Sequence, residues 1–170
     1  KKAQGRSIEW LQADMRVLDD VPTTDAVTLF SDSLCYLTDF EDVVSVFEAV
    51  YDHLEEGGIF LFDVHSLYQM QEVFPGYQYH FVEDDFAFLW QSYELDEPGS
   101  VEHVIDMYIK QEDGNLYEHF QEIHEEQTFP IEMYKAALEM AGFTNIKVKA
   151  DFGQSEVQET SPRWFFQAVK

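Results

Sequence analysis

Apolar and polar positions predict a strand, a helix and a second strand between residues 25 and 66. Ala26 to Phe30 is a short apolar run rich in β-branched and aromatic residues, as expected of a strand buried on both faces. Asp39 stands where an N-cap is expected, and a helix over residues 40–56 follows. Its apolar residues recur at the three- and four-residue spacing of one helical face: Val43, Val46, Phe47, Val50, Tyr51 and Leu54. Gly57 and Gly58 are expected to end this helix.

A second apolar run, Ile59 to Phe62, follows the glycines and closes with Asp63. A crossover helix between two buried strands makes those strands a parallel pair. Ligands of open α/β sheets bind beyond the carboxyl ends of such strands. Polar residues lie at both ends, Ser31-Asp32-Ser33 and Asp63-Val64-His65-Ser66. Either segment alone is more typical of an ordinary turn, but two on neighbouring strands predict a shared crevice.

Residues 67–127 have a different, strand-rich pattern. Strands are predicted at Tyr79 to Leu95, Val101 to Gln111 and Asn115 to Gln127. Turns are predicted at Glu97-Pro98-Gly99-Ser100 and at Asp113-Gly114. We therefore expect an antiparallel meander inserted after the strand that ends at Asp63.

The last part of the chain predicts one helix and two strands. Pro130 stands at a helix start, Ile131, Tyr134, Leu138 and Ala141 follow at helical spacing, and Gly142 ends the helix. Asn145 to Ala150 and Trp164 to Val169 are predicted as strands. The segment between them is polar.

Composition narrows the class of protein and of partner. A length of 170 residues favours one domain, and 45% apolar residues supply a core. The net charge of −24 disfavours nucleic acid and anionic membranes as partners. It suits a cationic or neutral small substrate, although acidity more commonly serves solubility.

Cys35 is the only cysteine, so an intrachain disulfide and a thiolate metal site are excluded. A packing role for this thiol is favoured over a nucleophilic one. No apolar run is long enough to span a bilayer, and no signal peptide is visible at Lys1. These features are compatible with a cytoplasmic location.

Several segments match a known pattern in order and spacing: Gln12-Ala13-Asp14-Met15-Arg16, Asp25 to Leu37, Leu54 to Asp63, Ala141-Gly142-Phe143 and Arg163 to Lys170. Together they resemble a class I S-adenosylmethionine-dependent methyltransferase. The resemblance implies an α/β fold with a Rossmann-like sheet, mostly parallel with a late antiparallel hairpin. Residues 1–66 and 128–170 would form this core, and residues 67–127 an inserted antiparallel β lid over the substrate. Ile8 to Leu11 would be the third strand of the complete fold.

The resemblance also predicts what these residues lack. A family member begins with a strand and a Gly-rich turn that cradles the cofactor, but the eight glycines here include no G-x-G-x-x-G cluster. We therefore expect the first βαβ unit to be missing from these 170 residues.

Candidate binding residues follow from the resemblance. Asp14 would accept a hydrogen bond from the adenine amino group of S-adenosylmethionine, and Met15 would contact the ring. Phe30, Ser31 and Asp32 would face the methionine part of the cofactor. Aromatic residues of the insertion would line the substrate pocket, although such residues more often form a packing face: Tyr68, Phe88, Trp90, Tyr108 and Phe120.

Two histidines are candidates for catalysis, His124 and His65, because an imidazole can orient or deprotonate an acceptor amine or hydroxyl near neutral pH. A histidine in either position is more often an ordinary surface or packing residue. The acidic-histidine stretch from residue 117 to 126 lacks a His-Glu-x-x-His spacing, and His119 and His124 would point to opposite faces of a strand. We therefore expect no metal.

The function predicted first is methyl transfer from S-adenosylmethionine to a small-molecule acceptor. One alternative is a nicotinamide-dependent oxidoreductase on a similar sheet. The other is a non-catalytic acidic interaction or dimerisation domain. The candidate partners are a small-molecule methyl acceptor and a second copy of the chain in a homodimer; a dimer that binds no nucleoside ligand would favour the interaction domain.

Overall fold

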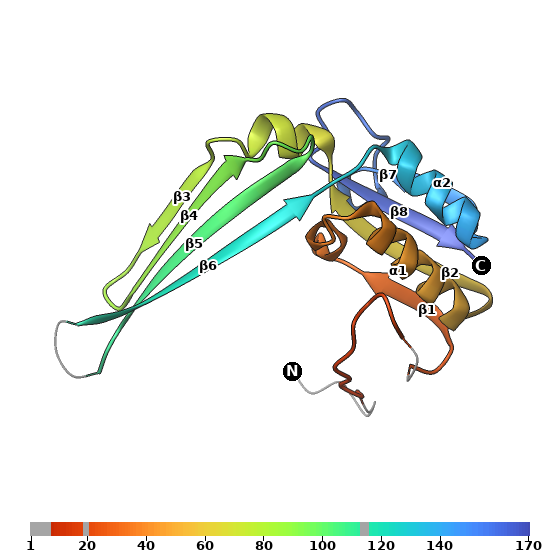
Figure 1. The fold of residues 1–170 in the computed structure, drawn as a ribbon, viewed down its shortest axis with the longest axis horizontal. Helices are drawn as coiled ribbons and strands as arrows, with labels where there is room; N and C mark the ends of the chain where they lie inside the picture. Colours follow the sequence, from red (N-terminus) through yellow and green to blue (C-terminus); the bar gives the residue numbers. More distant parts are fainter. Residues whose placement is uncertain (1–7, 19–20, 113–115) are drawn as a thin grey trace.

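The computed structural model describes residues 8–18, 21–112 and 116–170. The molecule is elongated, because a second sheet extends away from one side of an α/β core (Figure 1). The core sheet has the strand order β1-β2-β8-β7, and the second sheet has the order β3-β4-β5-β6. None of the helices in these ranges is long and apolar enough to cross a membrane.

The core sheet is built from β1 (Thr24–Leu29), β2 (Leu54–His65), β8 (Arg163–Val169) and β7 (Thr144–Lys149). The β1–β2 pair is parallel, as predicted, and β2–β8 and β7–β8 are antiparallel. The late antiparallel hairpin is thus confirmed, but the expectation of a mostly parallel sheet is wrong for the described strands. Neighbouring parallel strands need a crossover connection, and among the paired strands described here only β1 and β2 have one, through α1. The other two pairs are therefore antiparallel.

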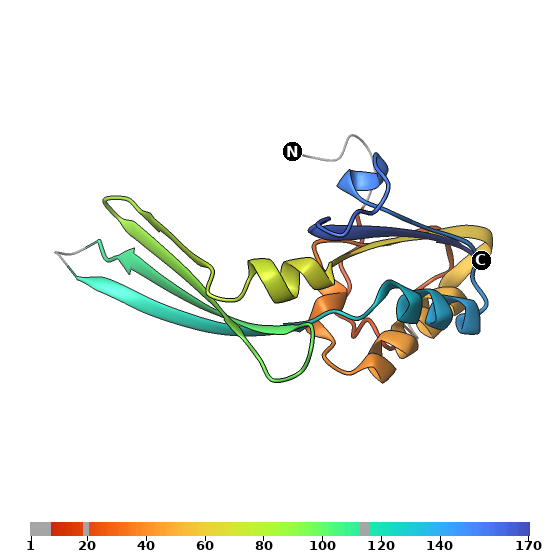
Figure 2. The same cartoon turned by 90° about the horizontal axis from the view of Figure 1, so that it is seen from above.

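Two helices, α1 (Phe40–His53) and α2 (Ile131–Ala141), cover the same face of the core sheet (Figure 2). Between helices and sheet, the fully buried Phe47 lies with its ring centroid 5.3 Å from that of Phe62. Phe62 stacks on Phe166 of β8 at 4.5 Å. Burying aromatic side chains in this way is a major source of stability. Cys35 is also fully buried in this core, as predicted.

The start of α1 is as predicted and its end is not. Asp39 is the N-cap, and its carboxylate accepts a hydrogen bond from the backbone N–H of Glu41 at 3.0 Å. The helix ends at His53, however, and Gly57 and Gly58 lie inside β2, where the β1–β2 register shifts. Gly57 has a φ of 77°, and a Cβ on Gly58 would lie 2.8 Å from the carbonyl oxygen of Glu55. The glycines therefore serve an irregular strand start rather than a helix end.

Two further strand predictions are wrong. β1 is an edge strand with several exposed residues, so it is not buried on both faces. Ile8 to Leu11 form no strand, and Trp10 is 87% exposed. An extended segment without a neighbouring strand cannot satisfy its backbone hydrogen bonds within a sheet.

The second sheet is the predicted antiparallel meander, made of β3 (Gln78–Val82), β4 (Phe86–Glu94), β5 (Ser100–Lys110) and β6 (Tyr117–Gln127). The single strand predicted from Tyr79 to Leu95 is in fact β3 and β4. The acidic residues 83–85 break it, and the N–H of Glu83 donates to the carbonyl of Phe86 across the turn. The predicted Asp113-Gly114 turn lies outside the described residues.

Short helical segments connect the core to the second sheet. The 3-10 helix η1 (Ser33–Tyr36) follows β1 and contacts β6, and the π-helix η2 (Gln69–Val73) follows β2 and contacts β5. A third short segment, η3 (Asp151–Gly153), lies on the core-sheet face opposite to α1 and α2 (Figure 2). The carboxyl ends of β1 and β2 therefore lie at the junction of the two sheets.

Candidate functional site

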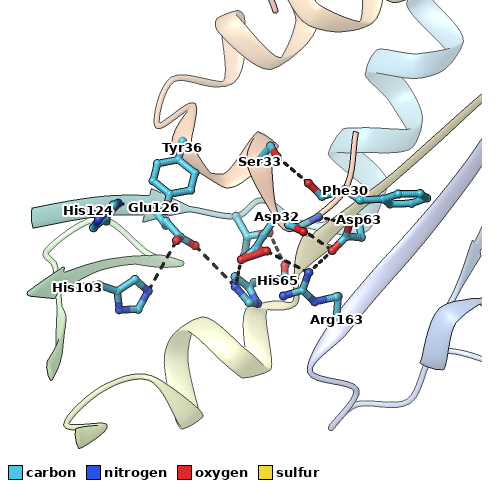
Figure 3. Close-up of polar contacts among 12 residues, drawn as sticks. Phe30, Asp32, Ser33, Tyr36, Asp63, His65, His103, His124, Glu126 and Arg163 are labelled. Carbon is cyan, nitrogen blue, oxygen red and sulfur yellow. Dashed lines mark hydrogen bonds and ion pairs between the residues drawn. The ribbon is translucent and has the colours of Figure 1, made fainter. Parts of the chain in front are cut away.

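The residues that follow β1 turn back toward the end of β2 (Figure 3). Ser31 and Asp32 have φ values of 62° and 52°, a left-handed conformation that is uncommon outside glycine. In this conformation their backbone N–H groups donate to the two carboxylate oxygens of Asp63, at 2.9 and 3.4 Å. The structure thus brings together the two polar segments that were predicted to share a crevice.

Arg163, at the start of β8, joins these carboxylates with a fixed positive charge. Its Nη1 donates to Asp32 Oδ1 at 3.0 Å and also to Asp63, which is only 1% exposed. Burial lowers the pKa of Arg163, but the charges of Asp32 and Asp63 outweigh burial and leave the pKa raised. The guanidinium is therefore a permanent cation of the site.

Asp32 also contacts the imidazole of His65 at the end of β2. Its Oδ2 lies 2.6 Å from His65 Nε2. Burial raises the pKa of Asp32, but the hydrogen bond from His65 and the charges of His65 and Arg163 outweigh burial, so the pKa lies below its ordinary value. Asp32 is accordingly a carboxylate at neutral pH.

Glu126 reaches the same site from the second sheet. It is 4% exposed, and its Oε2 lies 3.7 Å from His65 Nε2. Oε2 makes no hydrogen bond with the part of the chain that the structure describes. Burial raises the pKa of Glu126, and the nearby charge of Asp32 adds to this effect, although the charge of His65 opposes it.

His103 lies behind Glu126 on β5. Its Nε2 is 3.9 Å from Glu126 Oε1, and its Nδ1 is 2.7 Å from Ser92 Oγ. Burial, and then the charge of His65, lower the pKa of His103 to about 4. His103 is therefore neutral at neutral pH and does not compensate the charge of Glu126.

On the other side of Glu126, Tyr36 pairs with His124 (Figure 3). The Tyr36 hydroxyl lies 3.1 Å from His124 Nδ1, and His124 Nε2 lies 3.2 Å from Glu122. Burial, with the nearby charges of Glu126 and Asp32, raises the pKa of Tyr36 to about 12. The side chain of His124 is 26% exposed, so this imidazole is accessible to solvent.

The predicted adenine residues lie in a turn before β1. The carboxylate of Asp14 accepts hydrogen bonds from Arg16, including Nη2 to Oδ2 at 2.7 Å. These bonds lower the pKa of Asp14 to about 2. Arg16 also reaches Asp42 of α1 at 2.8 Å. Met15 packs against the core cluster.

The remaining predicted residues line the surroundings of the site. Phe30 and Ser31 border a pocket of about 560 Å³, together with Asp63, Phe152, Arg163 and Phe165. Trp90 packs its ring 5.3 Å from that of His103, and its Nε1 is buried with no partner among the described residues. Tyr68 is half-buried just before η2.

Glu126, His103 and Arg163 belong to the site but were not among the residues predicted from the sequence. Side chains alternate along a strand, so His124 and Glu126 lie on one face of β6. This alternation could have indicated from the sequence that Glu126 lies beside the candidate base His124. Opposite them on β5 are His103 and Val101, a register that the sequence did not reveal.

Comparisons with known proteins give the family. No family model matches. A protein of Geobacillus sp. (strain WCH70) named "Putative methyltransferase" is 38% identical to this chain, over 99% of the chain and 68% of the relative's own length. A protein of Bacillus subtilis (strain 168) named "Putative methyltransferase YqeM" is 37% identical, over 100% of the chain and 68% of the relative's own length. The chain belongs to the class I S-adenosylmethionine-dependent methyltransferases.

A solved structure agrees with this family. A S-adenosylmethionine-dependent methyltransferase from Clostridium acetobutylicum ATCC 824 matches with a TM-score of 0.85 and 26% identity, over 98% of this chain and 66% of that chain. The methyltransferase chain therefore spans about two thirds of the length of the relatives it matches. The family consists of enzymes, and S-adenosylmethionine is its methyl donor.

Proposed function

We propose that this methyltransferase transfers a methyl group from S-adenosylmethionine to a small-molecule nucleophile at the junction of the two sheets. The observation that carries the proposal is the pairing of the carboxyl ends of β1 and β2, where the N–H groups of Ser31 and Asp32 bind Asp63 beside a pocket of about 560 Å³. Ligands of open α/β sheets bind at this edge. The acidic charge of the chain supports a cationic or neutral acceptor rather than nucleic acid or a membrane surface.

The cofactor would contact two segments of this chain. Asp14 and Met15 would hold the adenine end, and Phe30, Ser31 and Asp32 the methionine end. The carboxylate of Asp14 already accepts from the backbone N–H, Nε and Nη2 of Arg16, so the adenine amino group would use what remains of its roughly four acceptor sites. Phe30 is 48% exposed and supplies an apolar wall.

Methyl transfer mainly requires that donor and acceptor are aligned in a site with little water. When bound, S-adenosylmethionine would supply an electrophilic methyl carbon to the lone pair of the acceptor, with its sulfonium sulfur as the leaving group. Tyr68 and Trp90 would help to hold the acceptor, with the second sheet serving as the lid. The acceptor must also lose a proton to a base.

His124 suits the role of base better than His65. Nε2 of His65 is already bound by Asp32 at 2.6 Å, whereas His124 is partly exposed and next to the Tyr36 hydroxyl. A base with access to water can release the proton after each turnover. In this arrangement His65 positions Asp32.

Calorimetric titration with S-adenosylhomocysteine, and separately with NADH, tests the proposal. We expect S-adenosylhomocysteine to bind and NADH not to bind. Asp14→Ala should weaken S-adenosylhomocysteine binding about tenfold, as the loss of a charged hydrogen-bond acceptor does. Asp42→Ala is the matched control, because Asp42 pairs with the same arginine at 2.8 Å without carrying the adenine contact.

Binding of NADH in place of S-adenosylhomocysteine would overturn the function. Equal S-adenosylhomocysteine affinity in wild type and Asp14→Ala would overturn the adenine assignment alone.

A further inference from the structure

Three side chains from separate parts of the fold converge at the junction (Figure 3). Asp32 follows β1, His65 ends β2, and Glu126 comes from β6 in the second sheet. One ligand-type atom of each lies within 4.8 Å of those of the other two. We propose that Asp32, His65 and Glu126 bind a divalent transition-metal ion that ties the second sheet to the core.

The carboxylate of Glu126 lacks a hydrogen-bond partner for one of its oxygens among the described residues. Glu126 is 4% exposed, and its Oε2 has no hydrogen-bond partner in the described ranges although it points toward His65 at 3.7 Å. A buried carboxylate oxygen without a partner is costly, and native proteins nearly always provide a donor or a cation. A bound cation at Glu126 would supply the missing partner.

The carboxylates at the junction outnumber the positive charges that face them. Arg163 neutralises one of its two carboxylate partners, Asp32 and Asp63, and His65 is bound to Asp32. Among the described residues, the other basic group within 4 Å of Glu126 is His103, whose Nε2 is 3.9 Å from Oε1, beyond hydrogen-bond distance, and whose Nδ1 is engaged with Ser92. A cation at Glu126 would remove the excess of buried negative charge.

Space favours an ion over an organic cation. Glu126, His103 and His65 are 4%, 3% and 8% exposed, so an organic group would have to displace several packed side chains. An ion would be held at distances of about 2.0–2.2 Å, and the three ligand atoms already lie within 4.8 Å of one another. His65 Nε2 and Asp32 Oδ2, now 2.6 Å apart, would separate as both turn to the ion.

The ligand set indicates which metal binds. One imidazole and two carboxylates suit Zn²⁺, Mn²⁺, Co²⁺ or Fe²⁺, whereas Mg²⁺ and Ca²⁺ prefer oxygen ligands alone. Bound to the metal through Nε2, His65 would have no free lone pair to accept a proton, which leaves His124 as the base of the proposed reaction. The metal proposal itself does not depend on methyl transfer, because it rests on side chains alone.

Calorimetric titration of chelator-treated, tag-free protein with ZnCl₂, MnCl₂ and MgCl₂, without S-adenosylmethionine, tests the site. We expect zinc or manganese to bind with one ion per chain and magnesium to bind far more weakly. Glu126→Gln and His65→Asn should each weaken binding about tenfold or more, in line with the loss of one ligand. His119→Asn is the matched control, because His119 and Asp106 form an exposed pair of the same 2.6 Å separation on the second sheet.

Thermal unfolding provides a second readout and shows that each variant is folded. Zinc should raise the melting temperature of wild type and His119→Asn but not that of Glu126→Gln. Failure of all three metals to bind would overturn the proposal. Binding that His119→Asn abolishes and Glu126→Gln retains would overturn it as well.

Discussion

Arg163 is the residue on which the charge balance of the site depends. It lies on β8 but binds Asp32 after β1 and Asp63 on β2, so one guanidinium connects three neighbouring strands. Both carboxylates are largely buried, with side-chain exposures of 18% and 2%. Removing one partner of a buried ion pair leaves the other charge without compensation.

We therefore predict that Arg163→Gln lowers the free energy of unfolding by about 3 kcal/mol, the cost of uncompensated buried charge. Lys135→Gln is the control, because the Lys135–Glu132 pair is exposed on α2 and such pairs contribute less than about 1 kcal/mol. Urea unfolding measures both variants. Equal effects of the two substitutions would show that Arg163 is an ordinary surface cation.

Asp14 gives a prediction about protonation. Its pKa is lowered to about 2 by hydrogen bonds from Arg16, so the ion pair stabilises this turn at neutral pH and the stabilisation is lost as pH falls from the ordinary pKa of 3.8 toward 2. Arg16→Gln should return the pKa of Asp14 to near 3.8. A carboxyl-carbon NMR titration measures this shift. An unchanged pKa would mean that another group holds Asp14.

The helix–sheet layer depends on close contacts at element ends. α2 stops at Gly142, whose φ is 106° and where a Cβ would lie 2.8 Å from the Tyr51 ring. Tyr51 in turn packs against Phe143 with ring centroids 5.2 Å apart. Gly142 thus combines a left-handed conformation with a lack of space.

Gly142→Ala should lower the free energy of unfolding by about 2 kcal/mol or more, because it adds a steric clash to backbone strain. Gly76→Ala is the matched control, since Gly76 also has a positive φ of 74° but nothing within 4 Å of its added Cβ. Thermal unfolding should show the larger loss for Gly142→Ala. Losses of the same size would mean that the Tyr51 contact is unimportant.

Local patterns in the sequence were sufficient for several elements. Asp39 and Gly142 mark helix ends by capping chemistry, which depends on only a few neighbouring residues. The parallel β1–β2 pair followed from the crossover helix, and it explains why Ser31 and Asp63 could be expected together. The errors at Gly57 and Gly58 arose because a glycine pair serves a bulged strand as well as a helix end.

The rest of the site depends on contacts between distant segments. Glu126 meets His65 only because β6 of the second sheet passes the end of β2, and Arg163 meets Asp32 across 131 positions of sequence. No local pattern encodes such a register. Ile8 to Leu11 failed as a strand prediction because a strand exists only beside a pairing partner.

At the scale of the whole molecule, two sheets with different pairing meet at one polar junction. The core sheet supplies the carboxyl ends of β1 and β2, and the second sheet supplies Glu126 and the Tyr36-bound His124. The open pocket beside Phe30 and Arg163 lies next to this junction. A donor bound at the core would therefore face residues of both sheets, while the lid role of the second sheet stays a prediction.

Hydrogen–deuterium exchange with and without S-adenosylhomocysteine tests most directly whether the cofactor binds at this edge of the core sheet. We predict slower exchange at residues 12–16, 30–33 and 63–66, with the far end of the second sheet, residues 78–88, unchanged. The opposite result would contradict binding at this edge: slower exchange only in residues 78–88, with residues 30–33 and 63–66 unaffected, while S-adenosylhomocysteine is bound.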